Sequence, residues 1–338
     1  MSQGADIRKA LGRLFLLAVP LLTVVAVYVV RDPFKVLWSH DFGNYYDQAA
    51  PVELNRDYAS LQIFLKNNPA QKYDSFILGS SRTFPLHVDT WRKLVPGIHP
   101  FHYPAASENL HGILLKLQYL NAHKIPLKHV IVELSVGLVR GPARTGYSHI
   151  VPYLLTGESW LEFQYRFLRA YFRASFFLKY TVFVLTGGHV NPGSQDALGG
   201  RPGRVRIDPV TNDYFFEAEE RELAENEDAY YARRAHFFQP AGKGCAGQAI
   251  GPAEKQYLEE IRSIFRQNGT DYRIWLPPTF DQHCVNPDDL ALLRDIFGPD
   301  KVFDFTGKWT DDMQNFYDPG HVRPFVGDKM FEEMYRAR

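Results

Sequence analysis

The 338-residue chain has only two cysteines, Cys245 and Cys284, and it has no Cys/His cluster with zinc-ligand spacing. The two can pair in an oxidising compartment or remain free thiols, and their spacing does not decide. The 38 basic and 38 acidic residues cancel, so composition implies no general attraction to nucleic acid. There is no glycine-rich phosphate loop, which argues against a nucleotide-binding protein, and no internal repeat.

One long stretch without charge lies near the amino terminus, at residues 14–30 (LFLLAVPLLTVVAVYVV), and it is about long enough to span a bilayer. Three basic residues precede it: Arg8, Lys9 and Arg13. They predict a cytoplasmic amino terminus and an exported domain. A cleaved signal peptide is the alternative, but the run is long for one and no small-x-small site follows. We therefore expect residues 1–35 to form a single-pass anchor in the cytoplasmic (inner) membrane, with residues 36–338 on the periplasmic or extracellular side.

Beyond residue 70, short apolar runs alternate with segments of helical periodicity. Strands are expected at 74–79, 129–134, 272–277 and 301–305. Helices are expected at 107–121, 252–269, 286–298 and 324–335. A shorter helix at 57–67, ended by Asn68-Pro69, precedes them, and 83–106 reads as a long proline-containing connection. The alternation predicts an α/β fold, a flavodoxin-like three-layer sandwich with helices on both faces of a parallel sheet.

Residues 150–250 interrupt this pattern and predict a helical and hairpin insertion. The aromatic-rich part, 150–187, has interleaved arginines and predicts one or two helices. It fits a lid, a membrane-surface contact or a partner-docking face, as well as ordinary packing on the sheet. The remaining segments are expected to be a surface loop at 188–204, a hairpin at 205–216, a solvated charged helix at 217–235 and a polar loop at 239–250.

Two short motifs stand near opposite ends of this domain. Gly79-Ser80-Ser81-Arg82 follows the first predicted strand, at the carboxyl end where α/β sheets bind ligands. Tyr317-Asp318-Pro319-Gly320-His321 precedes the last helix. An aspartate three residues before a histidine can fix the tautomer of the imidazole, which then takes a proton from a serine hydroxyl. The alternative is a turn with capping serines and a common Asp-x-x-His sequence.

Together the two motifs resemble those of the SGNH (GDSL-like) hydrolases. The resemblance is greatest to the membrane-anchored, envelope-facing branch that includes the alginate O-acetylation proteins and the D-alanyl transfer protein of teichoic acid synthesis. It spans roughly residues 70–338, with distinctive motifs only at its two ends. It implies that Ser81 is the nucleophile, His321 the general base and Asp318 the residue that orients it. It also implies that neither a metal nor an organic cofactor is needed.

The same resemblance implies an oxyanion hole of backbone N–H groups, and here the chain departs from the family pattern. The second of the sequence blocks typical of the family lies at a strand-to-helix turn and usually has a glycine; here it falls at Ala106 or Ser107. The third block usually has asparagine after a strand, whereas this chain has Glu133 and then Ser135. Ser135 can substitute as a donor, the hole can be built otherwise, or catalysis can be weak. Glu133 is either a structural acid paired with an arginine such as Arg82 or a polar strand end in solvent. Arg82 itself either binds an anionic substrate group or pairs with an acid.

The resemblance implies a serine esterase or O-acyltransferase that acts on acyl groups, most simply acetyl, of a cell-envelope or secreted polysaccharide. The implied partners are an acyl donor, a glycan acceptor and a membrane O-acyltransferase. Hydrolysis and transfer use the same triad and differ in water exclusion, so both remain open. The alternative is an inactive SGNH-like domain that binds glycan or scaffolds an export complex. His283, beside a strand end with Pro277 and Pro278, is interpreted as a surface histidine and not as a second base.

Overall fold

The computed structural model describes residues 3–42, 52–141, 146–187, 198, 205–238, 244–280 and 284–336. At its centre lies a five-stranded parallel sheet with the strand order β2-β1-β3-β6-β7. The strands are β1 (Ser75–Gly79), β2 (Pro100–Pro104), β3 (His129–Glu133), β6 (Asp271–Leu276) and β7 (Val302–Asp304). This is the doubly wound 2-1-3-4-5 order of flavodoxin-like folds, and the predicted α/β class is confirmed.

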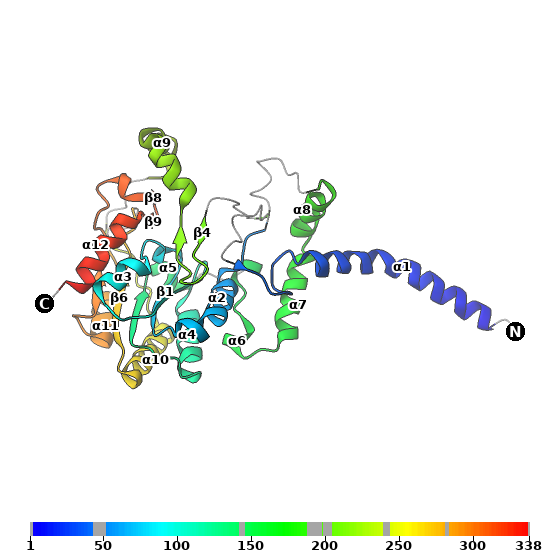
Figure 1. The fold of residues 1–338 in the computed structure, drawn as a ribbon, viewed down its shortest axis with the longest axis horizontal. Helices are drawn as coiled ribbons and strands as arrows, with labels where there is room; N and C mark the ends of the chain where they lie inside the picture. The colour runs from blue at the N-terminus through cyan, green and yellow to red at the C-terminus, as the bar shows by residue number, and fades with distance from the viewer. Residues whose placement is uncertain are drawn as a thin grey trace.

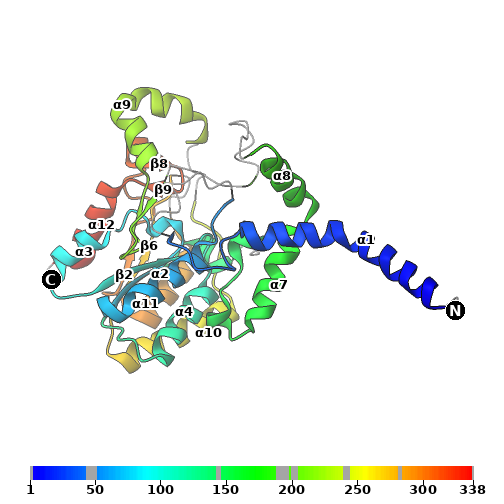
Figure 2. The same cartoon turned by 45° about the vertical axis from the view of Figure 1, so that its right-hand side comes forward.

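Alternating side chains of the strands enter two hydrophobic cores, one on each face of the sheet. Phe76 and Leu78 enter the first core. The helices of that face are α2 (Arg56–Gln71), α4 (Leu110–Ala122), α10 (Pro252–Asn268) and α11 (Pro287–Phe297). Ile77 enters the second core, on the other face. The helices there are α3 (Val88–Leu94), α9 (Glu217–Arg234) and α12 (Pro324–Tyr335). Helices therefore cover both faces of the sheet, as predicted (Figures 1 and 2).

Two segments differ from expectation. The predicted connection at 83–106 contains α3 and β2, which the sequence pattern missed. Because β2 is an edge strand, it tolerates Pro100 and Pro104 at its ends, where a missing N–H interrupts no interior ladder. Helix α2, expected at 57–67, does not stop at Pro69, because this proline falls in the last turn and removes only one terminal hydrogen bond. The helix ends instead at Lys72, whose left-handed backbone donates to the Asn68 carbonyl.

The insertion forms the expected helices and hairpin. Its elements are α6 (Tyr153–Thr156), α7 (Trp160–Tyr171), α8 (Ala174–Leu185), β4 (Arg206–Ile207), β5 (Tyr214–Phe215) and then α9. The predicted loop at 188–204 lies outside the described residues except for Leu198, and the polar loop at 239–250 is described only from residue 244. After β7 the chain forms a tight antiparallel hairpin of β8 (Phe316–Asp318) and β9 (His321–Val322).

The first helix, α1 (Gln3–Arg31), covers the predicted anchor and projects away from the sheet beside α7 and α8 (Figures 1 and 2). Its last turns pack on α7 and α8 in a third apolar cluster, where the Tyr28 ring lies 5.0 Å from the Tyr171 ring. Within the described part of the chain, no helix is both long enough and apolar enough to cross a bilayer. The membrane anchor expected at residues 14–30 stays a prediction.

Cys245 and Cys284 form a disulfide across 39 residues of sequence. The bond joins the segment before α10 to the segment before α11, and the Ala246 N–H also donates to the Cys284 carbonyl at 2.9 Å. Of the two alternatives left open by the sequence, free thiols or a disulfide, the structure has the disulfide. Such bonds persist mainly in oxidising compartments.

Candidate active site

Ser81 and His321 meet at the carboxyl edge of the sheet. Ser81 is the first residue of a short 3-10 turn after β1, and His321 is the first residue of β9. The Ser81 Oγ lies 2.8 Å from the His321 Nε2, across 240 residues of sequence. The His321 Nδ1 lies 2.9 Å and 3.0 Å from the two carboxylate oxygens of Asp318. The three residues singled out by the motifs are therefore joined in one hydrogen-bonded chain.

The Asp318 carboxylate sets the state of the imidazole. A carboxylate at Nδ1 favours the tautomer with its proton on that nitrogen, which leaves Nε2 to accept from the serine hydroxyl. Burial alone would raise the pKa of Asp318, but the hydrogen bond and charge attraction from His321 outweigh it and lower that pKa. The Gly320 N–H, which donates to Asp318 at 2.8 Å, acts in the same direction. Asp318 is thus an anion at neutral pH and can stabilise an imidazolium.

The turn that holds Ser81 is fixed from behind by Glu133, which is fully buried at the end of β3. One Glu133 oxygen accepts from the Ser80 N–H at 2.8 Å, and the other accepts from the Ser135 N–H at 2.9 Å. Gly79 has a φ of +152°, and a Cβ there would lie 2.6 Å from the Glu133 Cβ. Only glycine allows this approach of β1 to β3.

Glu133 therefore corrects the sequence interpretation in two respects. It is a structural acid, but its hydrogen-bond partners are backbone N–H groups and not Arg82. The alternative, a polar strand end in solvent, is wrong because the residue is 0% exposed. The pattern gave no signal for this role, since the Ser80 N–H lies 53 residues away in sequence.

An open cleft of about 420 Å³ lies in front of Ser81. Its lining includes Ser81, Arg82, Ser107, Ser135 and His321. Ala106, the other candidate for the second block, is not among the lining residues. Ser107 has a φ of +48°, the left-handed conformation that glycine adopts most readily. Ser107 thus stands in a glycine-like conformation beside the cleft, where the resemblance places a glycine.

Two of the predicted oxyanion donors differ in availability. Within the described residues, the Ser81 N–H makes no hydrogen bond and remains available. The Ser135 N–H donates to Glu133, and the Ser135 Oγ accepts from the Leu138 N–H at the start of α5 (Val136–Arg140). Ser135 can therefore offer only its hydroxyl proton to an oxyanion, at the place where the resemblance implies an asparagine donor.

Two arginines give the cleft a positive side. No described residue forms an ion pair with Arg82, so an acid partner for it, one of the two interpretations, is not found there. Arg140 donates to the carbonyl oxygens of Gly247 and Gln248 at 2.9 Å and 3.1 Å, which leaves its charge without a carboxylate there. Arg–carboxylate and Arg–phosphate geometry is favourable, so this side of the cleft suits an anionic group.

The turn before α4 is held by a buried ionic cluster that the sequence analysis missed. Lys116, fully buried, lies 3.1 Å from Asp57 and also pairs with Glu108, which follows Ser107. Its Nζ donates to the Tyr103 carbonyl at 3.3 Å as well. A signal was present, because Asp57 and Lys116 are charged residues within apolar helix faces. The cluster fixes the backbone on which Ser107 enters the cleft.

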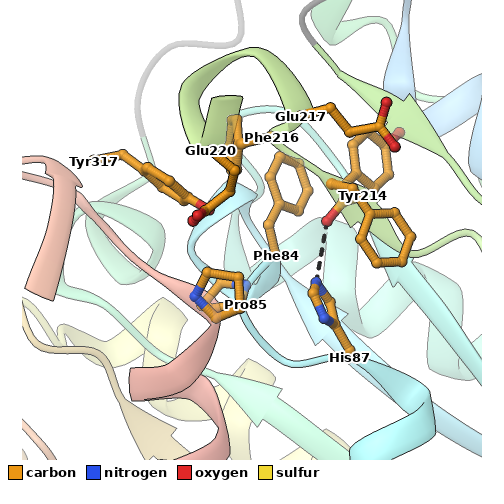
Figure 3. Close-up of a pocket in the computed structure, with 10 residues that line it drawn as sticks. Phe84, Pro85, His87, Tyr214, Phe216, Glu217, Glu220 and Tyr317 are labelled. Carbon is orange, nitrogen blue, oxygen red and sulfur yellow. Dashed lines mark hydrogen bonds between the residues drawn. The ribbon is translucent and has the colours of Figure 1, made fainter. Parts of the chain in front are cut away.

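A second, smaller pocket of about 140 Å³ lies behind the Asp–His hairpin (Figure 3). Figure 3 shows that its lining is mostly aromatic, together with Pro85 and the acidic residues Glu217 and Glu220. Phe216 is 6.2 Å from the His321 ring and 4.9 Å from the Tyr317 ring, measured between centroids. The Tyr317 hydroxyl donates to Glu220 at 2.6 Å. The insertion thus places the aromatic ring of Phe216 beside both Tyr317 and His321.

The other histidine of the sequence analysis, His283, lies outside the described residues, and Pro277 and Pro278 do not line the cleft. No protein-family model matches the chain, and no curated protein matches it either. The resemblance to SGNH hydrolases therefore stays a prediction. Chemically, the arrangement offers a serine hydroxyl, a base that reaches it, an anion behind the base and a free N–H at the serine.

Proposed function

We propose that this protein is a membrane-anchored, extracytoplasmic serine esterase or O-acyltransferase of the SGNH type. Its substrates are acyl groups, in the simplest case acetyl, on a cell-envelope or secreted polysaccharide. The observation that carries the proposal is the hydrogen-bonded chain from Ser81 through His321 to Asp318 at the edge of an open cleft. A nucleophile, its base and the group that orients the base are the minimum set for acyl transfer through a covalent intermediate.

In the proposed reaction, the Ser81 Oγ attacks the acyl carbonyl while the His321 Nε2 takes the hydroxyl proton. The Ser81 N–H, the backbone at Ser107 and the Ser135 hydroxyl hold the oxyanion. When the C–O bond to the leaving alcohol breaks, His321 returns its proton to that alcohol and an acyl-serine remains. Water or a sugar hydroxyl then attacks the acyl-serine and gives its proton to His321. When the bond between the acyl group and the Ser81 Oγ breaks, His321 passes that proton to the Oγ and the acid or new ester is released. Asp318 remains anionic throughout.

The extracytoplasmic location rests on two features of the chain. The disulfide between Cys245 and Cys284 fits an oxidising compartment. The uncharged run at 14–30 behind three basic residues fits an anchor with its amino terminus in the cytoplasm. An anchored domain close to the bilayer would receive acyl groups from a membrane donor, which favours transfer over hydrolysis. A membrane O-acyltransferase is the partner that this arrangement calls for.

A second candidate is an inactive domain that binds glycan or scaffolds an export complex. The observation that favours it is the Ser135 N–H, which donates to Glu133 instead of facing the cleft. The chain also has Ser135 where the family usually has an asparagine donor. With one donor fewer, an oxyanion is stabilised less, since the loss of one such donor raises the barrier by about 2.7–4 kcal/mol. Binding of a glycan in the same cleft would not need that donor.

Covalent labelling separates the two candidates. Full-length wild type, Ser81→Ala and His321→Ala would be treated with a fluorophosphonate probe and assayed for hydrolysis of p-nitrophenyl acetate. We expect one adduct, on Ser81, and a loss of about a thousandfold or more in both variants. Ser263→Ala and His123→Ala are matched controls at exposed positions outside the cleft, and they should retain labelling. Absence of any adduct, with equal rates in all five proteins, would reject the enzyme and leave the binding domain.

A further inference from the structure

Helix α8 exposes an apolar face that no described residue covers. Leu178, Val182 and Leu185 lie on one side of the helix at i, i+4 and i+7, and they are 63%, 58% and 80% exposed. The opposite side of α8 is also apolar, because Phe176 and Tyr180 are buried in the cluster that α8 forms with α7 and α1. A soluble protein rarely leaves such a face in water, so it marks a contact surface.

The neighbouring helices also expose apolar residues. On α7, Leu161, Tyr165 and Phe172 follow one another at helical spacing and are exposed. On α1, Leu21, Leu22 and Val30 are exposed as well. Both views show α1, α7 and α8 side by side, on the far side of the molecule from α12 and the carboxyl terminus (Figures 1 and 2). The exposed apolar residues of three adjacent helices thus belong to one region of the molecule.

An arginine-lined pocket lies at the start of α8. It has a volume of about 340 Å³, and its lining includes Arg166, Arg169 and Arg173. Arg173 is the residue that precedes the first turn of α8. Arg166 pairs with Glu158 at 3.0 Å, whereas no carboxylate among the described residues pairs with Arg169 or Arg173. At least two uncompensated guanidinium groups therefore face one pocket, and their planar donors match the oxygens of a phosphate.

We propose that α7 and α8 dock on an anionic phospholipid bilayer. Leu178, Val182 and Leu185 enter the boundary of the acyl chains, and the arginine pocket takes a lipid phosphate. An interfacial helix buries its apolar face at this depth and keeps basic groups at the level of the headgroups. A protein partner is the less fitting occupant, because the core of a protein interface is depleted of charge whereas a cluster of cations lies at the start of this same helix. The inference does not depend on the serine chemistry.

Docking can be measured at α8 itself. Because the two natural cysteines are paired, a single cysteine introduced by Leu185→Cys can be labelled with an environment-sensitive fluorophore. The labelled full-length protein would be reconstituted in vesicles of phosphatidylglycerol and phosphatidylcholine. We expect a blue shift and quenching by brominated acyl chains at 185, and neither at Gln267→Cys on α10, the exposed control. Insertion of α1 alone would leave both labels in water, so equal emission at the two sites overturns the proposal. Leu178→Cys repeats the test if the first variant is unstable.

A second set of variants tests the proposed binding of a lipid phosphate in the arginine-lined pocket. Arg169→Gln/Arg173→Gln should reduce insertion of the label at 185 roughly fivefold per arginine, and Arg266→Gln on α10 should not. In wild type, insertion should increase with the fraction of phosphatidylglycerol, and inorganic phosphate alone should leave the emission unchanged. Equal insertion into purely phosphatidylcholine vesicles, together with an unaffected double variant, would overturn the headgroup site. A label buried only in a complex with another protein would assign the face to that protein and overturn the lipid proposal.

Discussion

Replacement of Glu133 would test the inferred framework of the site. Glu133→Ala removes the acceptor of two buried backbone N–H groups, those of Ser80 and Ser135. An orphaned buried donor costs about 1–3 kcal/mol, so the two cost about 2–6 kcal/mol before any loss of packing. Domains of this kind have free energies of unfolding of about 5–15 kcal/mol, so Glu133→Ala would remove a large share of the stability. Glu133→Gln keeps one oxygen and turns an amide N–H₂ toward one of the donors, which costs about 1–3 kcal/mol.

Urea unfolding followed by circular dichroism would measure these free energies. Glu259→Gln, at an exposed position of α10, is the matched control and should stay within about 0.5 kcal/mol of wild type. The rate of fluorophosphonate labelling at Ser81, taken where Glu133→Gln is fully folded, reports on the turn separately. We expect slower labelling, because Ser80 precedes the nucleophile and loses its anchor. If Glu133→Ala matched the control in stability and labelling, the role inferred for this carboxylate would be refuted.

Three further predictions concern single contacts. Lys116→Met leaves two buried carboxylates without their cation and should lower the free energy of unfolding by about 3–5 kcal/mol in urea. The pKa of Asp318 is lowered in the fold, so its contact with His321 stabilises the protein fully above the ordinary pKa of about 3.9. That stabilisation is lost as the pH falls through the lowered pKa. In melting curves recorded over a pH series, Asp318→Asn should remove this acid-dependent loss of stability. Reduction of the disulfide, which closes 39 residues, should destabilise the domain by about 4 kcal/mol in unfolding with and without reductant.

The sequence was sufficient for elements whose residues are uniformly apolar or periodic. The runs that became β1 and β3 are buried on both faces of the sheet, so pattern alone identified them. The edge strand β2 was missed because prolines at both ends masked a short strand. The helix expected from 107 begins at Leu110, with Asn109 as its cap, because Ser107 adopts a left-handed backbone instead. The next residue, Glu108, pairs with Lys116 in a buried cluster that includes Asp57, and local sequence does not encode such contacts between distant residues.

The side chains of the candidate site could be predicted from the sequence, whereas the contacts that hold its backbone in place could not. Ser81, Asp318 and His321 could be found because each follows or lies between recognisable elements, and a parallel sheet brings the ends of its strands to one edge. Glu133 could not be assigned, because its partners are backbone N–H groups, which any sequence supplies. The hydrogen bond from the Ser135 N–H to Glu133 could not be predicted either, because a backbone N–H is present at every position except proline.

The use of a carboxylate at the end of β3 has an electrostatic consequence for the proposed reaction. Glu133 fixes the nucleophile turn, yet it also places a buried carboxylate one residue away from the position where an oxyanion would form. Its two oxygens are turned toward N–H donors, which spreads that charge over the backbone. Arg82 and Arg140 line the same cleft, and neither pairs with a carboxylate among the described residues. In the proposed reaction, their positive charge acts in the opposite sense to that of Glu133 and favours a negative charge in this cleft.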